Sequence, residues 1–200
     1  LGSLGLMNEG ITSTQLGLPG IPAIAEELMI ARDIELLKYT NSKLHITGVS
    51  SATTIELIRA AKKEGLAISC SVTPTHLFYC DEDMTTYNTN LKVIPPVRTK
   101  ADRDALRAAV VDGTIDCIAS HHAPQDWDHK VCEFEYAEFG NIGLQTTYAT
   151  LEQTVPGLTP TQVSNLLSGN ARQIFGLPMV SIEEGQAAEL TIFNRTATTT

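Results

Sequence analysis

Short apolar segments alternate with helical segments along the middle of this chain, and that order limits the folds it can adopt. Residues 43–47, 67–72 and 115–120 have the length and composition of strands, and the last two are apolar enough to be buried on both faces. Residues 51–64 and 100–111 lie between them and show helical periodicity. Strands that alternate with helices are typical of a parallel sheet covered by helices. The pattern therefore predicts an α/β fold.

The flanking segments are less regular. Residues 1–21 are rich in Gly, Ser, Thr and Pro, and we expect a loop there. Residues 22–39 are predicted to form a helix, because apolar side chains recur at helical spacing after an initial proline. Further helices are predicted over 144–153 and between 160 and 175. Residues 182–193 read as a glycine-containing turn followed by an apolar strand.

The composition excludes several classes of protein. The net charge of −9 argues against sequence-independent binding to nucleic acid or to an anionic membrane, since both need clustered Lys and Arg. No apolar run reaches the roughly 20 residues of a membrane span, and we recognise no signal peptide. Four cysteines without a C-x-x-C pair suit reduced thiols, so we expect a cytoplasmic protein. The first residue is not Met, and we expect the chain to be a fragment.

Recognisable motifs follow the predicted strands. Residues 118–125 read I-A-S-H-H-A-P-Q, residues 73–77 read T-P-T-H-L, and residues 92–98 read K-V-I-P-P-V-R. In their order and spacing they resemble the dihydroorotases of the amidohydrolase superfamily, whose motifs read approximately I-A-T-D-H-A-P-H, T-P-H-H-L and K-M-N-P-P-L-R. The resemblance implies a family of zinc-dependent hydrolases of pyrimidine biosynthesis that act on cyclic amides.

The same resemblance implies the domain organisation. Residues 1–178 would form the C-terminal half of a TIM-type (β/α)8 barrel of the metal-dependent hydrolase kind. Residues 179–200 would form a strand segment that returns to a small β-sandwich domain. The family's H-x-H pair of metal ligands would lie before Leu1, since no H-x-H occurs in this chain.

Two positions that bind metal in the family have changed. The family motif H-x-x-H-V-S-T corresponds to H-I-T-G-V-S-S here, which places Gly48, with no donor side chain, at a ligand position. The Asp of the last strand, a ligand and proton-transfer group, is replaced by His121. Imidazole can bind zinc or act as a base, but it lacks the charge of a carboxylate. We therefore expect no metal in this chain, and His121 is the catalytic candidate if any activity remains.

Five further residues correspond to the substrate pocket that the resemblance implies: His76, Arg98, His122, Phe139 and Gly140. Local packing is the alternative explanation for His76, Phe139 and Gly140. Regular strand alternation would point His121 and His122 to opposite faces, so we do not expect them to chelate a metal together. Ile94 stands where the family has Asn, and it cannot hydrogen-bond a polar substrate.

Three functions remain open. The chain can be a non-catalytic homologue that acts as a structural partner, of aspartate transcarbamoylase or through self-association. It can instead be an active cyclic amidohydrolase for a small cyclic amide, with its other site residues upstream. It can also be a metal-free binding module for a small molecule in the same pocket. The combined loss of ligand and polar site positions favours the first.

Overall fold

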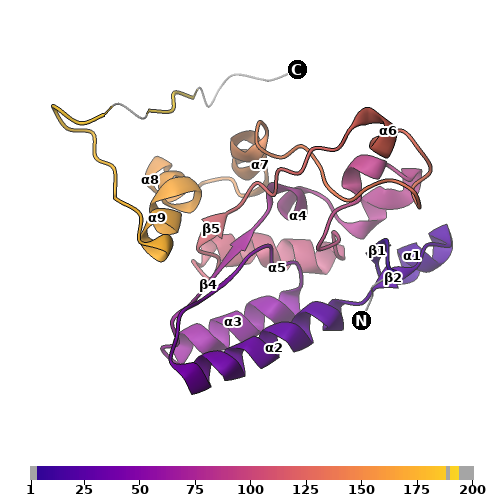
Figure 1. The fold of residues 1–200 in the computed structure, drawn as a ribbon, viewed down its shortest axis with the longest axis horizontal. Helices are drawn as coiled ribbons and strands as arrows, with labels where there is room; N and C mark the ends of the chain where they lie inside the picture. Colours follow the sequence, from indigo (N-terminus) through magenta and orange to yellow (C-terminus); the bar gives the residue numbers. More distant parts are fainter. Residues whose placement is uncertain (1–3, 188–189, 194–200) are drawn as a thin grey trace.

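A three-stranded parallel sheet forms the centre of the chain, with helices as its crossovers. The computed structural model describes residues 4–187 and 190–193. The strands and their connecting helices are, in chain order, β3 (Leu44–Ile46), α3 (Ala52–Lys63), β4 (Ile68–Val72), α5 (Lys100–Val111) and β5 (Cys117–Ile118). The strand order is β3-β4-β5, and both pairs are parallel (Figure 1). The predicted α/β fold is therefore confirmed, while closure into a barrel stays a prediction.

The two crossover helices α3 and α5 begin at capping side chains. The Ser51 hydroxyl accepts the Thr54 amide at 3.1 Å at the start of α3. Thr99 and Asp102 form a reciprocal capping box at the start of α5. Helix α2 (Ala23–Thr40) packs beside α3 and agrees with the helix predicted over 22–39.

The two faces of the sheet differ in chemistry. The face toward the helices carries apolar side chains in the main core, among them Ile68, Cys70 and Val72. On the opposite face, His45 Nδ1 lies 2.8 Å from the Ser69 hydroxyl. The hydroxyls of Thr47 and Ser71 on that face are 3.4 Å apart. All residues of β4 are buried, which confirms the prediction that this strand is buried on both faces, although strand alternation places Ser69 and Ser71 together on the face away from the apolar core.

Residues 4–21 contain more regular structure than their composition indicates. Strands β1 (Met7–Asn8) and β2 (Gly20–Ile21) pair in parallel, and α1 (Ile11–Leu16) connects them. The expected loop is therefore wrong for much of this segment. Met7 is buried in a second, smaller core and anchors it. Strands this short give no periodic pattern in the sequence, because each has only two residues.

The remaining elements follow β4 and β5. They are α4 (Pro74–Phe78), the 3-10 helices η1 (Asp81–Thr86) and η2 (Thr89–Leu91), α6 (Trp127–Lys130), α7 (Thr147–Thr154), α8 (Pro160–Ser164), the π-helical η3 (Asn165–Gly169) and α9 (Asn170–Phe175). The helices predicted over 144–153 and 160–175 are confirmed with shifted boundaries. None of the helices in the described part of the chain is long and apolar enough to cross a membrane.

The C-terminal segment departs from its prediction. The turn at Gly185 is present, with the Gln186 amide bonded to the Glu183 carbonyl at 3.2 Å. The strand expected after it is not formed at residues 187 and 190–193, and the segment runs away from α9 (Figure 1). Residues 188–189 and 194–200 of that expectation lie outside the described residues. The division at residues 178 and 179 and the β-sandwich domain stay predictions.

The core that carries the sheet can be tested at Ile58, which is fully buried on α3. Ile58→Ala should lower the free energy of unfolding by roughly 2–5 kcal/mol, because it removes apolar contacts and leaves a cavity. Ile24→Ala on α2 is the control, because Ile24 is 51% exposed. Denaturant unfolding of both variants measures the difference, and equal losses would contradict this description of the core.

Candidate functional site

A cavity of about 360 Å³ lies at the carboxyl ends of β4 and β5. It is lined by Thr73, Thr75, His76, Val93, Ile94, His121, His122, Ala123, Phe139, Gly140 and Asn141. This set contains every candidate residue from the sequence except Arg98. Ligands of parallel α/β folds bind at the carboxyl ends of the strands, so the cavity is the candidate site. Whether these residues bind a substrate stays a prediction.

His121 leaves the strand geometry. Strand β5 ends at Ile118, and His121 has a left-handed backbone conformation with a φ of 44°. Its Nε2 lies 3.1 Å from the Thr47 hydroxyl, beyond the end of β3. Burial lowers the pKa of His121, which keeps the ring neutral at neutral pH. Because the backbone turns here, His121 and His122 line the same cavity, and the expectation that they point to opposite faces is wrong.

Gly48 and His121 fit against each other. Gly48 has a φ of 74°, and a Cβ placed on it would lie 2.4 Å from His121 Cε1. Real Cβ atoms do not approach another heavy atom that closely, so the imidazole takes the space where a side chain at position 48 would begin. The sequence showed the two changes separately, and the structure joins them in one contact.

His76 is fully engaged inside the protein. Its Nδ1 lies 2.6 Å from the Thr73 hydroxyl, and its Nε2 lies 2.9 Å from the Pro95 carbonyl. A carbonyl can only accept, so Nε2 carries the proton and Nδ1 accepts from Thr73. Burial lowers the pKa of His76 to about 4, so the ring is neutral. Nδ1 therefore binds the N-cap residue of α4, and Nε2 ties this helix to the loop of Pro95, which agrees with the local-packing alternative.

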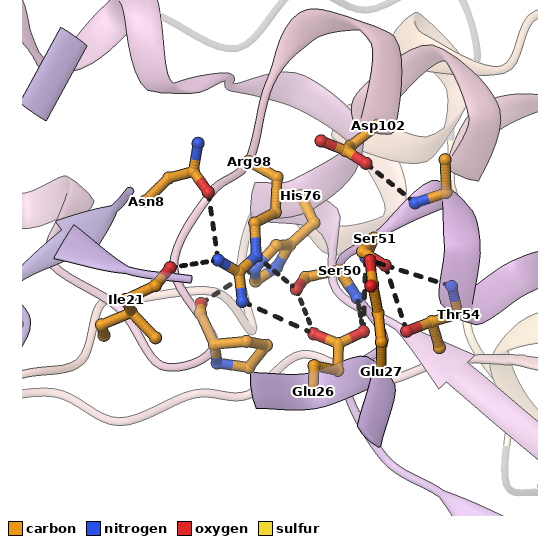
Figure 2. A network of polar contacts seen from close by, with 12 residues as sticks. Asn8, Ile21, Glu26, Glu27, Ser50, Ser51, Thr54, His76, Arg98 and Asp102 are labelled. Carbon is orange, nitrogen blue, oxygen red and sulfur yellow. Dashed lines mark hydrogen bonds and ion pairs between the residues drawn. The ribbon is translucent and has the colours of Figure 1, made fainter. Parts of the chain in front are cut away.

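Arg98 is held in a network beside the cavity rather than on its wall. Figure 2 shows its guanidinium between Asn8 of β1, Ile21 of β2 and Glu26 of α2. Nη1 donates to Asn8 Oδ1 at 3.0 Å, and Nε donates to the Ser50 hydroxyl at 3.1 Å. Glu26 lies 4.0 Å from Nη2 and also accepts from the Ser50 hydroxyl. Burial lowers the pKa of Arg98, and Glu26 opposes that shift. The geometry supports a structural role for Arg98.

The loop after β5 is held over the cavity by its own polar contacts. His122 Nδ1 accepts the Gly143 amide at 3.3 Å, which leaves its proton on Nε2. Asn141 donates to the Thr75 hydroxyl at 2.7 Å, and the Ala123 amide donates to the Asn141 carbonyl at 3.0 Å.

Lys92 was missed by sequence reasoning. Its side chain is buried, and its ammonium group donates to the Phe134 and Glu135 carbonyls at 2.8 and 3.0 Å. The same group lies 4.9 Å from the centre of the Phe139 ring, which positions that ring at the cavity. Lysines are mostly exposed, so the sequence offers no signal for this role beyond the K-V-I-P-P-V-R motif itself.

The residues at this site do not fit the zinc that the family resemblance implies. Among the residues that the structure describes, no group of three or more His, Cys, Asp or Glu side chains could hold a metal ion. Gly48 offers no donor, His76 has both nitrogens engaged, and His121 Nε2 contacts Thr47. A structural zinc needs four ligands and a catalytic zinc usually needs three from the protein.

The buried His76 predicts a pH dependence of stability. The unfolded chain takes up a proton on this group near pH 6.5, whereas the folded protein does so only near its pKa of about 4. The free energy of unfolding should therefore fall as pH drops through that window, by on the order of 3 kcal/mol from this group. His76→Gln should lack that part of the slope. Denaturant unfolding at several pH values checks this, and equal slopes in the two proteins would contradict it.

Comparison with curated proteins identifies relatives along nearly the whole chain, although no protein-family model matches it. A dihydroorotase from Syntrophus aciditrophicus is 42% identical over 192 residues, which is 95% of this chain and 45% of the relative. A dihydroorotase from Caldanaerobacter subterraneus is 44% identical over 193 residues, with 95% and 44% covered. The chain thus spans less than half the length of these relatives.

Solved structures of hydantoinases share the fold. The L-hydantoinase (dihydropyrimidinase) of Arthrobacter aurescens superposes with a TM-score of 0.72 at 25% identity, covering 78% of this chain and 36% of its own. The dihydropyrimidinase of Brevibacillus agri gives a TM-score of 0.71 at 20% identity, with the same coverage. The arrangement of the described elements is therefore that of a segment of these enzymes.

Proposed function

Because this chain is a homologue of the dihydroorotases over 95% of its length, we propose that it is a catalytically silent member of that family. It corresponds to their C-terminal part and serves as a structural homologue of the enzyme. The contact between Gly48 and His121 carries this proposal. Gly48 has no side-chain donor at one of the family's ligand positions, and the His121 imidazole fills the adjoining space.

The chemistry of the family depends on what this site lacks. A metal-dependent hydrolase uses its metal to lower the pKa of a bound water and to polarise the carbonyl under attack. A carboxylate beside the metal then accepts and returns the proton. Here His121 is neutral and tied to Thr47, and the cavity lining holds no Asp or Glu. These residues supply shape and hydrogen bonds, and they support no hydrolytic step.

A catalytic assay tests the silent state. The purified protein, with zinc added, should open the ring of dihydroorotate no faster than a protein-free blank. The same sample with a chelator is the matched control. Turnover above the blank that disappears on chelation would contradict the proposal and favour an active cyclic amidohydrolase whose remaining site residues lie outside this chain.

The structural role implies a protein partner. We propose an aspartate transcarbamoylase or a second copy of this chain, within cytoplasmic pyrimidine biosynthesis. β3 and β5 pair only with β4 in the described part of the chain, and such edges can pair with further strands. Light scattering on this chain alone should detect a dimer, or the mixture with a purified transcarbamoylase should contain a species larger than the transcarbamoylase. A monodisperse monomer in the first sample, together with no such larger species in the mixture, would contradict the proposed partners.

The cavity favours binding of a small molecule without metal as a second function. Its volume of about 360 Å³ lies in the range of ligand sites, and Ile94, Phe139, His122 and Asn141 mix apolar and polar lining. Hydantoin, a cyclic amide, should raise the unfolding temperature of the protein at millimolar concentration. Ile94→Trp should abolish this rise in the unfolding temperature by filling the cavity. Leu36→Trp, at an exposed position of α2, should leave the rise unchanged. No rise in any of the proteins would exclude this function for cyclic amides.

A further inference from the structure

A chain of polar groups joins the ends of all three strands of the sheet. The Gly48 amide lies 3.3 Å from the Ser71 hydroxyl and donates to the Ser71 carbonyl at 3.1 Å. The Ser71 hydroxyl donates to Thr47 Oγ1 at 3.4 Å, and Thr47 Oγ1 lies 3.1 Å from His121 Nε2. We call Thr47, Gly48, Ser71 and His121 the strand-end clamp.

The first two bonds of this chain have an assigned direction. The Gly48 amide can only donate, so the Ser71 oxygen accepts there and its hydroxyl hydrogen is free for Thr47. The Thr47 hydroxyl both donates and accepts, so its bond with His121 Nε2 forms with either tautomer of the ring. The chain thus runs from Gly48 after β3 to Ser71 in β4, returns to Thr47 at the end of β3, and reaches His121 after β5.

The clamp also depends on shape. His121 keeps a φ of 44°, a conformation that costs free energy for a residue with a Cβ. Its ring meets Gly48 where any side chain would collide with it. Ser71 is almost fully buried, so its hydroxyl cannot turn to bulk water without loss. The strained His121 backbone and the bare Gly48 are therefore complementary parts of one contact.

We infer that the strand-end clamp holds the carboxyl ends of β3, β4 and β5 together without a metal, at the place where metal-dependent relatives hold one. Gly48 leaves the space that the His121 ring occupies, and Thr47 joins that ring to Ser71. The inference rests on the family relationship for the comparison with a metal, and on this structure alone for the contacts.

A double-mutant cycle tests the steric half of the clamp. Gly48→Ala, His121→Ala and the double variant are compared with the unchanged protein by denaturant unfolding. Gly48→Ala should raise the unfolding equilibrium constant by a further 5- to 30-fold beyond Gly65→Ala, roughly the factor of one to two kcal/mol. Gly65 is the matched control, because its φ is 81° and a Cβ there meets nothing within 4 Å. In the His121→Ala background that excess should disappear.

Two further measurements cover the polar half, and they stay informative if Gly48→Ala fails to fold. Thr47→Val keeps the side-chain shape and removes the hydroxyl, so it should destabilise the protein, and its effect should shrink when His121 is already Ala. Zinc and a chelator should both leave the unfolding midpoint of the unchanged protein where it is.

The outcomes separate this inference from the proposed function. Additive effects of the Gly48 and His121 changes, or a midpoint that zinc raises, would overturn the clamp. Metal-dependent turnover in the catalytic assay would overturn the silent state, yet it would leave the coupling between Thr47 and His121 to be judged by stability alone.

Discussion

The site depends on the fit of the His121 imidazole against the bare α-carbon of Gly48. His121 has a left-handed backbone conformation after β5, and its ring reaches the Thr47 hydroxyl beyond the end of β3. His122 follows this backbone turn and lines the cavity. The loop that begins there is held in place by hydrogen bonds of Asn141 and Lys92. Interiors pack closely, so a single bulky group at this point defines the shape around it.

The fold was predictable where local chemistry and periodicity agree. The helices α2, α3 and α5 bury one apolar stripe each and begin at suitable residues, so both their existence and their order follow from the sequence. Strands β1 and β2 were not predictable, because a strand of two residues shows no periodicity. The strand expected after Gly185 had an apolar composition, but composition alone does not supply a partner strand.

The candidate site was predictable in membership and less so in role. Motif positions led to the residues around the cavity, but hydrogen-bond partners decide what each can do. His76 and Arg98 are residue types that often bind ligands. Only the structure shows that their donors and acceptors are engaged by other groups of the protein. The buried Lys92 and the contact between positions 48 and 121 join residues far apart in the chain. A single sequence holds no signal for such pairs.

Metal content tests the central claim most directly. The protein is purified without chelator, equilibrated with excess zinc, passed through a desalting column, and its zinc measured per chain by mass spectrometry. A site whose described residues spend their donors on one another should retain no stoichiometric zinc. The account predicts a ratio near that of a metal-free control protein. One or two zinc ions per chain, lost in a His121→Ala variant, would contradict it.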